Sequence, residues 1–187
     1  MMESESSLTV LLGGARSGKS KLGAALIEAW DGPAGVIATA EALDEEMAER
    51  IERHRRARPA GWPVVEEPID LEGALTGFDP GTAVLIDCLT LWVSNLMGED
   101  LGETEIEHRA TVAAGVAATR GGLTVAVSNE VGSGIVPVNE MARQYRDLLG
   151  RVNAIWADVA GRVLLTVAGG VIPVSRIGEV FDWGSDG

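Results

Sequence analysis

Short uninterrupted apolar runs alternate along the chain with longer stretches in which apolar residues recur every three or four positions. The runs are typical of parallel strands buried on both faces, and the longer stretches have the period of amphipathic helices. We predict strands over residues 8–12, 35–38, 83–86, 123–127 and 163–167, with weaker strands at 64–65 and 171–174. We predict helices over residues 21–30, 44–58, 103–119 and 138–160. This alternation predicts an α/β fold whose mostly parallel sheet is flanked by helices.

Length and composition suit one globular domain. The chain has 187 residues, of which 46% are hydrophobic and 23% charged, enough to bury a sizeable core. We expect a leader over residues 1–7, a single domain over 8–175 and a C-terminal tail over 176–187. No segment resembles an interdomain linker or an internal repeat.

Charge and cysteine content narrow the class of protein. A formal net charge of −13 argues against a nucleic-acid-binding face. The single cysteine, Cys88, rules out an intrachain disulfide and fits a reducing compartment. The N-terminus lacks a signal pattern and no apolar run is long enough to span a membrane, so we expect a cytoplasmic protein.

Residues 13–20 read Gly-Gly-Ala-Arg-Ser-Gly-Lys-Ser and match the phosphate-binding pattern G-x-x-x-x-G-K-[ST]. A predicted strand precedes them and a predicted helix follows, which is the arrangement that a phosphate cradle needs. We expect Lys19 to reach the β- and γ-phosphate oxygens, and the Ser20 hydroxyl to ligate Mg²⁺. The candidate nucleotide-binding residues here are Gly13, Gly14, Ala15, Arg16, Ser17, Gly18, Lys19 and Ser20.

A second candidate for Mg²⁺ is Asp87, which ends the apolar run 83–86. A P-loop enzyme needs a carboxylate on a neighbouring strand to hold the metal ion, and ligands of open parallel sheets bind at the carboxyl ends of the strands. Apolar runs that end in aspartate are also common at turns, so the assignment depends on the P-loop beside it.

The predicted helix over 44–58 begins with acidic residues and ends with arginines, which matches the helix dipole. Met47, Ile51 and His54 fall on one face of it. His54 alone is compatible with an ordinary, partly exposed helix histidine. It is also compatible with a neutral imidazole that attacks the α-phosphorus of a nucleotide, with arginines to stabilise the phosphate charge.

Residues 128–137 carry a carboxylate and two glycines directly after the predicted strand 123–127. This position suggests a substrate loop, although generic glycine-rich connections have similar sequences. The apolar positions of the helix that follows indicate core or a subunit interface.

Together these segments resemble one family. The stretches 13–20, 38–40, 44–51, 129–137, 143–147 and 150–153 occur in the same order, with His54 and Trp62 between them, in the bifunctional adenosylcobinamide kinase/adenosylcobinamide-phosphate guanylyltransferases of cobalamin biosynthesis. The resemblance runs from residue 8 to about residue 174. The segment 98–122 contains no motif that aligns with the family.

The resemblance implies a RecA-like P-loop NTPase domain, a homotrimer, and two reactions. The first phosphorylates adenosylcobinamide with ATP or GTP, and the second transfers GMP from GTP to adenosylcobinamide phosphate, giving adenosylcobinamide-GDP. It implies that Lys19 and His54 are catalytic, with His54 as the covalent GMP carrier and Mg²⁺ as cofactor. The further nucleotide contacts that it implies are Ala38, Thr39, Ala40, Arg55, Arg56, Ala57, Arg58, Glu66 and Asp87.

Two other functions remain compatible with the sequence. One is a different small-molecule P-loop kinase, which would transfer only the γ-phosphate and need no histidine. The other is a nucleotide-dependent switch protein, against which the lack of a recognisable arginine-finger segment counts.

Overall fold

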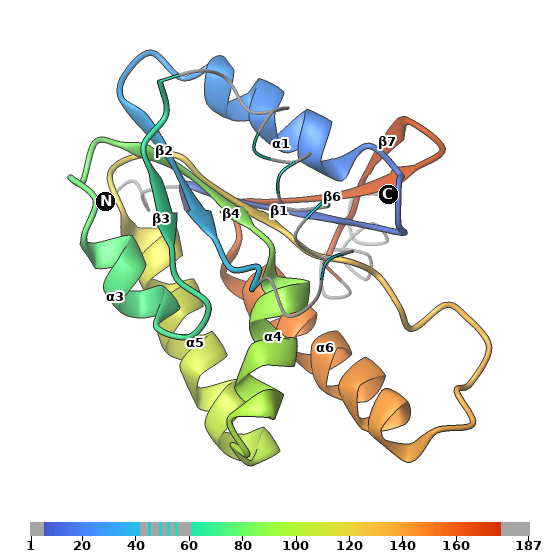
Figure 1. Ribbon diagram of the computed structural model, residues 1–187. Helices are drawn as coiled ribbons and strands as arrows, with labels where there is room; N and C mark the ends of the chain where they lie inside the picture. The colour runs from blue at the N-terminus through green and yellow to red at the C-terminus, as the bar shows by residue number, and fades with distance from the viewer. Residues whose placement is uncertain are drawn as a thin grey trace, which may run out of the picture.

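A computed structural model of the chain describes residues 6–41, 45, 49, 52, 55 and 61–176. Its centre is a seven-stranded sheet in the order β3-β2-β4-β5-β1-β6-β7 (Figure 1). All pairings are parallel except that of β6 with β7. The strands are β1 Leu8–Gly13, β2 Ala34–Ala38, β3 Val64–Glu66, β4 Ala83–Asp87, β5 Thr124–Val127, β6 Arg162–Val167 and β7 Gly170–Pro173.

Helices cover both faces of this sheet. The helix α1 lies alone on one face among the described elements, and α3, α4, α5 and α6 lie on the other (Figure 1). Their bounds are α1 Lys19–Glu28, α3 Leu71–Thr76, α4 Leu89–Gly98, α5 Glu103–Thr119 and α6 Glu140–Val159. Side chains of Asp70 and Asn139 cap α3 and α6 by accepting hydrogen bonds from backbone N–H groups three residues on.

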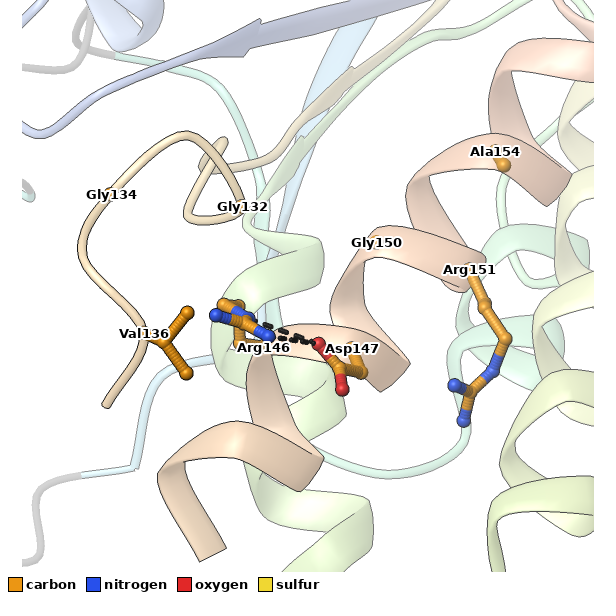
Figure 2. A pocket seen from close by; sticks show the side chains of 8 residues that line it. All are labelled: Gly132, Gly134, Val136, Arg146, Asp147, Gly150, Arg151 and Ala154. Atoms are coloured by element: carbon orange, nitrogen blue, oxygen red, sulfur yellow. Dashed lines mark hydrogen bonds and ion pairs between the residues drawn. The ribbon is translucent and has the colours of Figure 1, made fainter. Parts of the chain in front are cut away.

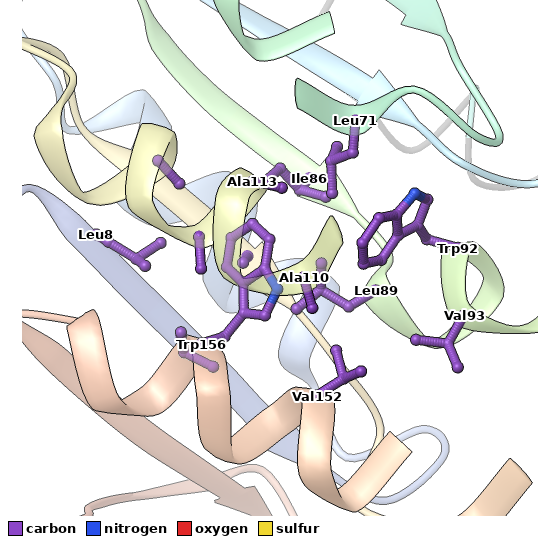
Figure 3. Packing of buried hydrophobic residues seen from close by; sticks show 14 of the residues in the cluster. Leu8, Leu71, Ile86, Leu89, Trp92, Val93, Ala110, Ala113, Val152 and Trp156 are labelled. Atoms are coloured by element: carbon purple, nitrogen blue, oxygen red, sulfur yellow. The ribbon is translucent and has the colours of Figure 1, made fainter. Parts of the chain in front are cut away.

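The core has two parts because β1 is buried on both faces. Leu8 and Val10 point into the larger cluster, where Trp92 and Trp156 are the largest buried side chains (Figure 3). Leu11 points the opposite way, into the smaller cluster under α1. This explains why the predicted strands read as continuous apolar runs rather than as alternating ones.

The predicted architecture is confirmed, including the strong strands, both weaker strands, and the helix over 103–119. The helix α1 begins two positions before the predicted 21, inside the phosphate-binding motif. Two helices, α3 and α4, were not predicted from the pattern. The helix α4 starts two residues after β4, and its buried residues Leu89, Trp92, Val93 and Leu96 are spaced three and four apart, a short helical period that the sequence analysis missed.

The predicted helix over 44–58 falls mostly outside the described residues, although Glu45, Glu49, Glu52 and Arg55 have helical backbone. Only Arg176 of the predicted tail is described, and its guanidinium donates to the Ala160 carbonyl at 2.8 Å. In the described part of the chain, no helix is both long and apolar enough to cross a bilayer.

Candidate nucleotide and acceptor site

The phosphate-binding motif forms the turn between β1 and α1. Gly13 and Gly18 have φ angles of 150° and 105°, and Arg16 is also left-handed at 58°. A Cβ at Gly13 would lie 2.4 Å from the Thr166 carbonyl oxygen and 2.9 Å from Ser17 Oγ. Glycine is therefore required at position 13 by both conformation and space.

Lys19 is the cation at the centre of this turn. Its side chain is buried, with 6% of the residue exposed, and its Nζ donates to the carbonyls of Gly13 at 2.8 Å and Gly14 at 2.7 Å. Gly18, the N-cap of α1, provides no side-chain cap to the first helical turn. A buried lysine beside an uncapped helix N-terminus forms an environment suited to phosphate oxygens.

The turn is braced from β6 and from the β6–β7 connection. Ser17 Oγ lies 2.7 Å from Thr166 Oγ1, which also donates to the Leu12 carbonyl at 3.1 Å. The Gly169 amide donates to the Ser17 carbonyl at 3.3 Å. The sequence analysis did not identify Thr166, and no motif marks it, because its role depends on β6 pairing with β1.

Asp87 ends β4 and is half-buried at the same edge of the sheet. We expected Asp87 on the strand next to the P-loop strand, and this expectation was wrong. The strand β5 is inserted between them, so that Val127 pairs with both Asp87 and Leu11. Chain order could not reveal this, because β5 is formed by residues that follow β4 by more than thirty positions.

The residues at this edge fit a magnesium ion in their chemistry. Ser20 and Asp87 offer the hard oxygen donors that Mg²⁺ prefers, and such a site normally keeps several waters and substrate phosphate oxygens as its remaining ligands. A cage of three or more His, Cys, Asp or Glu side chains is absent from the described residues.

Thr39 holds the turn that follows Asp87. It is fully buried, and its hydroxyl donates to the Cys88 carbonyl at 2.7 Å and accepts from the Cys88 amide at 2.9 Å. Asn95 of α4 donates to the Thr39 carbonyl at 2.7 Å. Burial, helped by the Asp87 charge, raises the pKa of the Cys88 thiol to about 11, so this thiol is neutral near pH 7.

The other predicted nucleotide contacts are placed only in part. Ala38 and Ala40 flank Thr39 at the end of β2, and Glu66 is exposed at the end of β3, paired in register with Ala38. Arg55 forms an ion pair with Glu66. The predicted site residues His54, Arg56, Ala57 and Arg58 lie outside the described residues.

The loop after β5 is tied to the P-loop and to two helices. The Glu130 amide donates to the Gly13 carbonyl at 3.0 Å. The Asn129 amide donates to Thr90 Oγ1 at 2.7 Å, and Asn153 of α6 donates to the Asn129 carbonyl at 3.1 Å. The predicted substrate loop therefore starts beside the phosphate-binding turn.

An open groove of about 490 Å³ lies between this loop and α6 (Figure 2). Arg146 points across it toward Val136 and pairs with Asp147 at 2.9 Å. The lining residues are Gly132, Gly134, Val136, Arg146, Asp147, Gly150, Arg151 and Ala154.

A mostly parallel sheet, a P-loop with a buried lysine and a carboxylate two strands away define an α/β P-loop nucleotide-binding domain. The chain belongs to the cobinamide kinase / cobinamide phosphate guanyltransferase family, whose model matches residues 9–174. The resemblance seen in the sequence is thereby confirmed.

Named relatives support the same membership over nearly their whole length. The chain is 40% identical over 172 residues to the bifunctional adenosylcobalamin biosynthesis protein CobP of Pseudomonas aeruginosa, covering 91% of this chain and 97% of that protein. It is 38% identical over 176 residues to the bifunctional adenosylcobalamin biosynthesis protein CobU of Salmonella typhimurium, covering 87% of this chain and 96% of that protein. The CobU protein of Escherichia coli is 39% identical over 175 residues, with the same coverage of 87% and 96%.

Proposed function

We propose that this chain phosphorylates adenosylcobinamide with ATP or GTP, and then transfers GMP from GTP to adenosylcobinamide phosphate. The observation that carries the proposal is the family match over residues 9–174, which includes the P-loop and the loop after β5. Both reactions act on a nucleoside triphosphate, and one phosphate-binding turn serves both.

The phosphate-binding turn supplies charge for both reactions. Lys19 and the first turn of α1 bind the β- and γ-phosphates, because their positive charge lies in a buried, low-dielectric position. Ser20 and Asp87 would hold Mg²⁺, which neutralises phosphate charge when it is bound. Ala38, Thr39, Ala40 and Glu66, with the arginine-rich stretch 55–58, stay predicted nucleotide contacts.

His54 is the proposed nucleophile of the second reaction. Its neutral imidazole attacks the α-phosphorus of GTP, a P–N bond forms, and pyrophosphate leaves. The phosphate of the acceptor then attacks the same phosphorus, and the imidazole leaves. A covalent carrier divides one difficult displacement into two easier ones.

We also propose that the chain assembles as a homotrimer and works in the cytoplasm, where ATP and GTP are available. Exposed apolar side chains support an assembly, because burial between subunits would remove them from water. Ile135 is 96% exposed and Val138 is 98% exposed in the single chain. Light scattering on the purified protein measures the number of subunits directly.

Incubation with GTP labelled at the α-phosphate tests the function. We expect the wild-type protein to retain the label on His54, in a linkage that is acid-labile and stable to alkali, and to release pyrophosphate. The His54→Asn variant should retain no label and lose GMP transfer, while keeping part of its kinase activity because γ-phosphoryl transfer needs no histidine. Peptide mapping by mass spectrometry identifies the labelled residue.

His108 provides the matched control. It is the other histidine of the chain, lies exposed on α5 and is not part of the candidate site. The His108→Asn variant should label and turn over like the wild type. Label on His108, or no label during active GMP transfer, contradicts the mechanism.

A further inference from the structure

We propose that Glu130 accepts the proton of the acceptor hydroxyl during phosphoryl transfer, and that the acceptor lies in the groove between residues 132–136 and α6. This inference rests on the proposed function. It assigns a proton acceptor to the first of the two reactions. The second reaction needs none.

The position of Glu130 in the sheet is the first argument. Glu130 follows β5, which lies between the P-loop strand β1 and the Asp87 strand β4. Its amide donates to the Gly13 carbonyl at 3.0 Å, and the same carbonyl accepts from Lys19 Nζ at 2.8 Å. The backbone of Glu130 is therefore one hydrogen bond away from the carbonyl that holds the phosphate-binding lysine.

The carboxylate itself is available for proton transfer. Glu130 is half-buried, and its Oε1 accepts from the Gly132 amide at 2.6 Å. Among the described residues, no cation forms an ion pair with it and no donor reaches its second oxygen. One oxygen thus orients the carboxylate, and Oε2 can accept a proton from a substrate.

The groove opens at the residue to which this carboxylate is bound. Gly132 begins one wall, and Gly150 and Ala154 of α6 are exposed on the other (Figure 2). A glycine inside a helix costs about 1 kcal/mol relative to alanine. A Cβ at Gly150 would meet nothing within 4 Å in the part of the chain that the structure describes, so packing against those residues does not require glycine there. Space for the acceptor explains the glycine at position 150.

The lining suits a bulky acceptor with both apolar and amide groups. Val136 is 60% exposed at the rim and supplies an apolar contact there. Arg146 and Asp147 offer a donor and an acceptor for amides inside the groove. Apolar walls with a few convergent polar groups are typical of small-molecule sites.

Only the first of the two reactions requires a proton to be removed from the acceptor. In the first, the acceptor hydroxyl oxygen bonds to the γ-phosphorus, the bond from that phosphorus to the β-γ bridging oxygen breaks, and the hydroxyl proton moves to Glu130 Oε2. In the second, the attacking oxygen belongs to a phosphate that is already ionised near pH 7. No proton has to be removed, so Glu130 has no role in that step.

The Glu130→Gln variant separates these reactions. The amide oxygen still accepts from the Gly132 amide, so the loop is retained, but the proton acceptor is removed. We expect kcat for phosphorylation of adenosylcobinamide to fall about 100-fold or more. GMP transfer to pre-phosphorylated adenosylcobinamide and GTP-dependent self-labelling should stay within about threefold of wild type, a barrier change of under 1 kcal/mol.

Three variants serve as comparisons. Asp87→Asn should lower both reactions, because both use the triphosphate site. Ala154→Leu fills the groove and should raise KM for the acceptor about tenfold or more, while leaving self-labelling intact. Ala25→Leu places the same side chain on an exposed position of α1, away from the groove, and should leave that KM unchanged.

Equal losses of phosphorylation and GMP transfer in Glu130→Gln would show that Glu130 only supports the site, and unchanged phosphorylation would place the base elsewhere. An unchanged acceptor KM in Ala154→Leu would remove the acceptor from this groove. A wild-type protein that labels itself with GMP but never phosphorylates the acceptor would contradict the proposed kinase activity, and with it this role of Glu130.

Discussion

Single residues at the phosphate-binding turn are determined by space as much as by charge. Gly13 has a left-handed φ of 150° and lies against the Thr166 carbonyl, whereas a Cβ at the adjacent Gly14 would meet nothing within 4 Å. The two glycines look equivalent in the motif. The structure shows that Gly13 is required by contact and conformation, whereas no described residue crowds the position of a Cβ at Gly14.

The pair offers a direct comparison. Gly13→Ala should lower the free energy of unfolding by about 2 kcal/mol or more, because it combines backbone strain with a backbone clash. Gly14→Ala should change it by less than about 0.5 kcal/mol. Urea unfolding of both variants measures the difference. Equal stability of the two would show that the turn relaxes easily around a side chain at position 13.

Among the elements, β2, β4 and α4 are joined at one point by Thr39. Its hydroxyl bonds both backbone groups of Cys88, and Asn95 of α4 bonds its carbonyl. Asp87 immediately precedes Cys88, so the orientation of the proposed magnesium ligand depends on this junction. Thr39 therefore contributes to the site through the backbone that it holds.

Thr39→Val keeps the shape of the side chain and removes both hydrogen bonds to Cys88. We expect a loss of about 1–3 kcal/mol in stability, because a buried donor and a buried acceptor lose their partner. The apparent affinity for Mg²⁺, measured from turnover, should fall as well. Thr119→Val removes an exposed hydroxyl bonded within α5 and serves as the control, with little effect in urea unfolding or Mg²⁺ titration. Normal stability of Thr39→Val would contradict this account.

At the scale of the whole molecule, Arg120 joins the end of α5 to the connection between α3 and β4. Its guanidinium donates to the carbonyls of Asp79 at 3.2 Å and Thr82 at 3.0 Å, and also to the Leu75 carbonyl. Burial lowers the pKa of this guanidinium from its ordinary value. One side chain thus holds three carbonyls of this connection together, those of Leu75 and Asp79 beside their backbone donors and that of Thr82 outside any strand or helix.

Arg120→Met removes the guanidinium from all three carbonyls; those of Asp79 and Leu75 keep a backbone donor, and that of Thr82 loses the donor that Arg120 provides. We expect the free energy of unfolding to fall by about 2–4 kcal/mol, more than for a surface ion pair. Arg109→Met, which removes an exposed pair with Glu105, should cost less than about 1 kcal/mol. Thermal and urea unfolding compare the two. Similar small losses in both variants would show that water replaces the guanidinium at these carbonyls.

Sequence by itself determined the strands, the described helices other than α3 and α4, and the position of the phosphate-binding motif. Apolar runs predicted the buried strands, and the eight-residue pattern at 13–20 predicted the phosphate-binding turn, because both signals depend on neighbours in the chain. Order along the chain also placed Asp87 and Glu130 after strands, at the carboxyl edge of the sheet. His54 and its arginines stay predictions, since they lie outside the described residues.

Tertiary structure alone decided which of these residues meet. Strand order put β5 between β1 and β4, which brought Glu130 beside Gly13 and set Asp87 two strands from the P-loop. The same order brought Thr166 against the P-loop and made Thr39 a support for the turn after Asp87. Such contacts join residues far apart in the chain, and pairing between distant strands leaves no local pattern in a sequence.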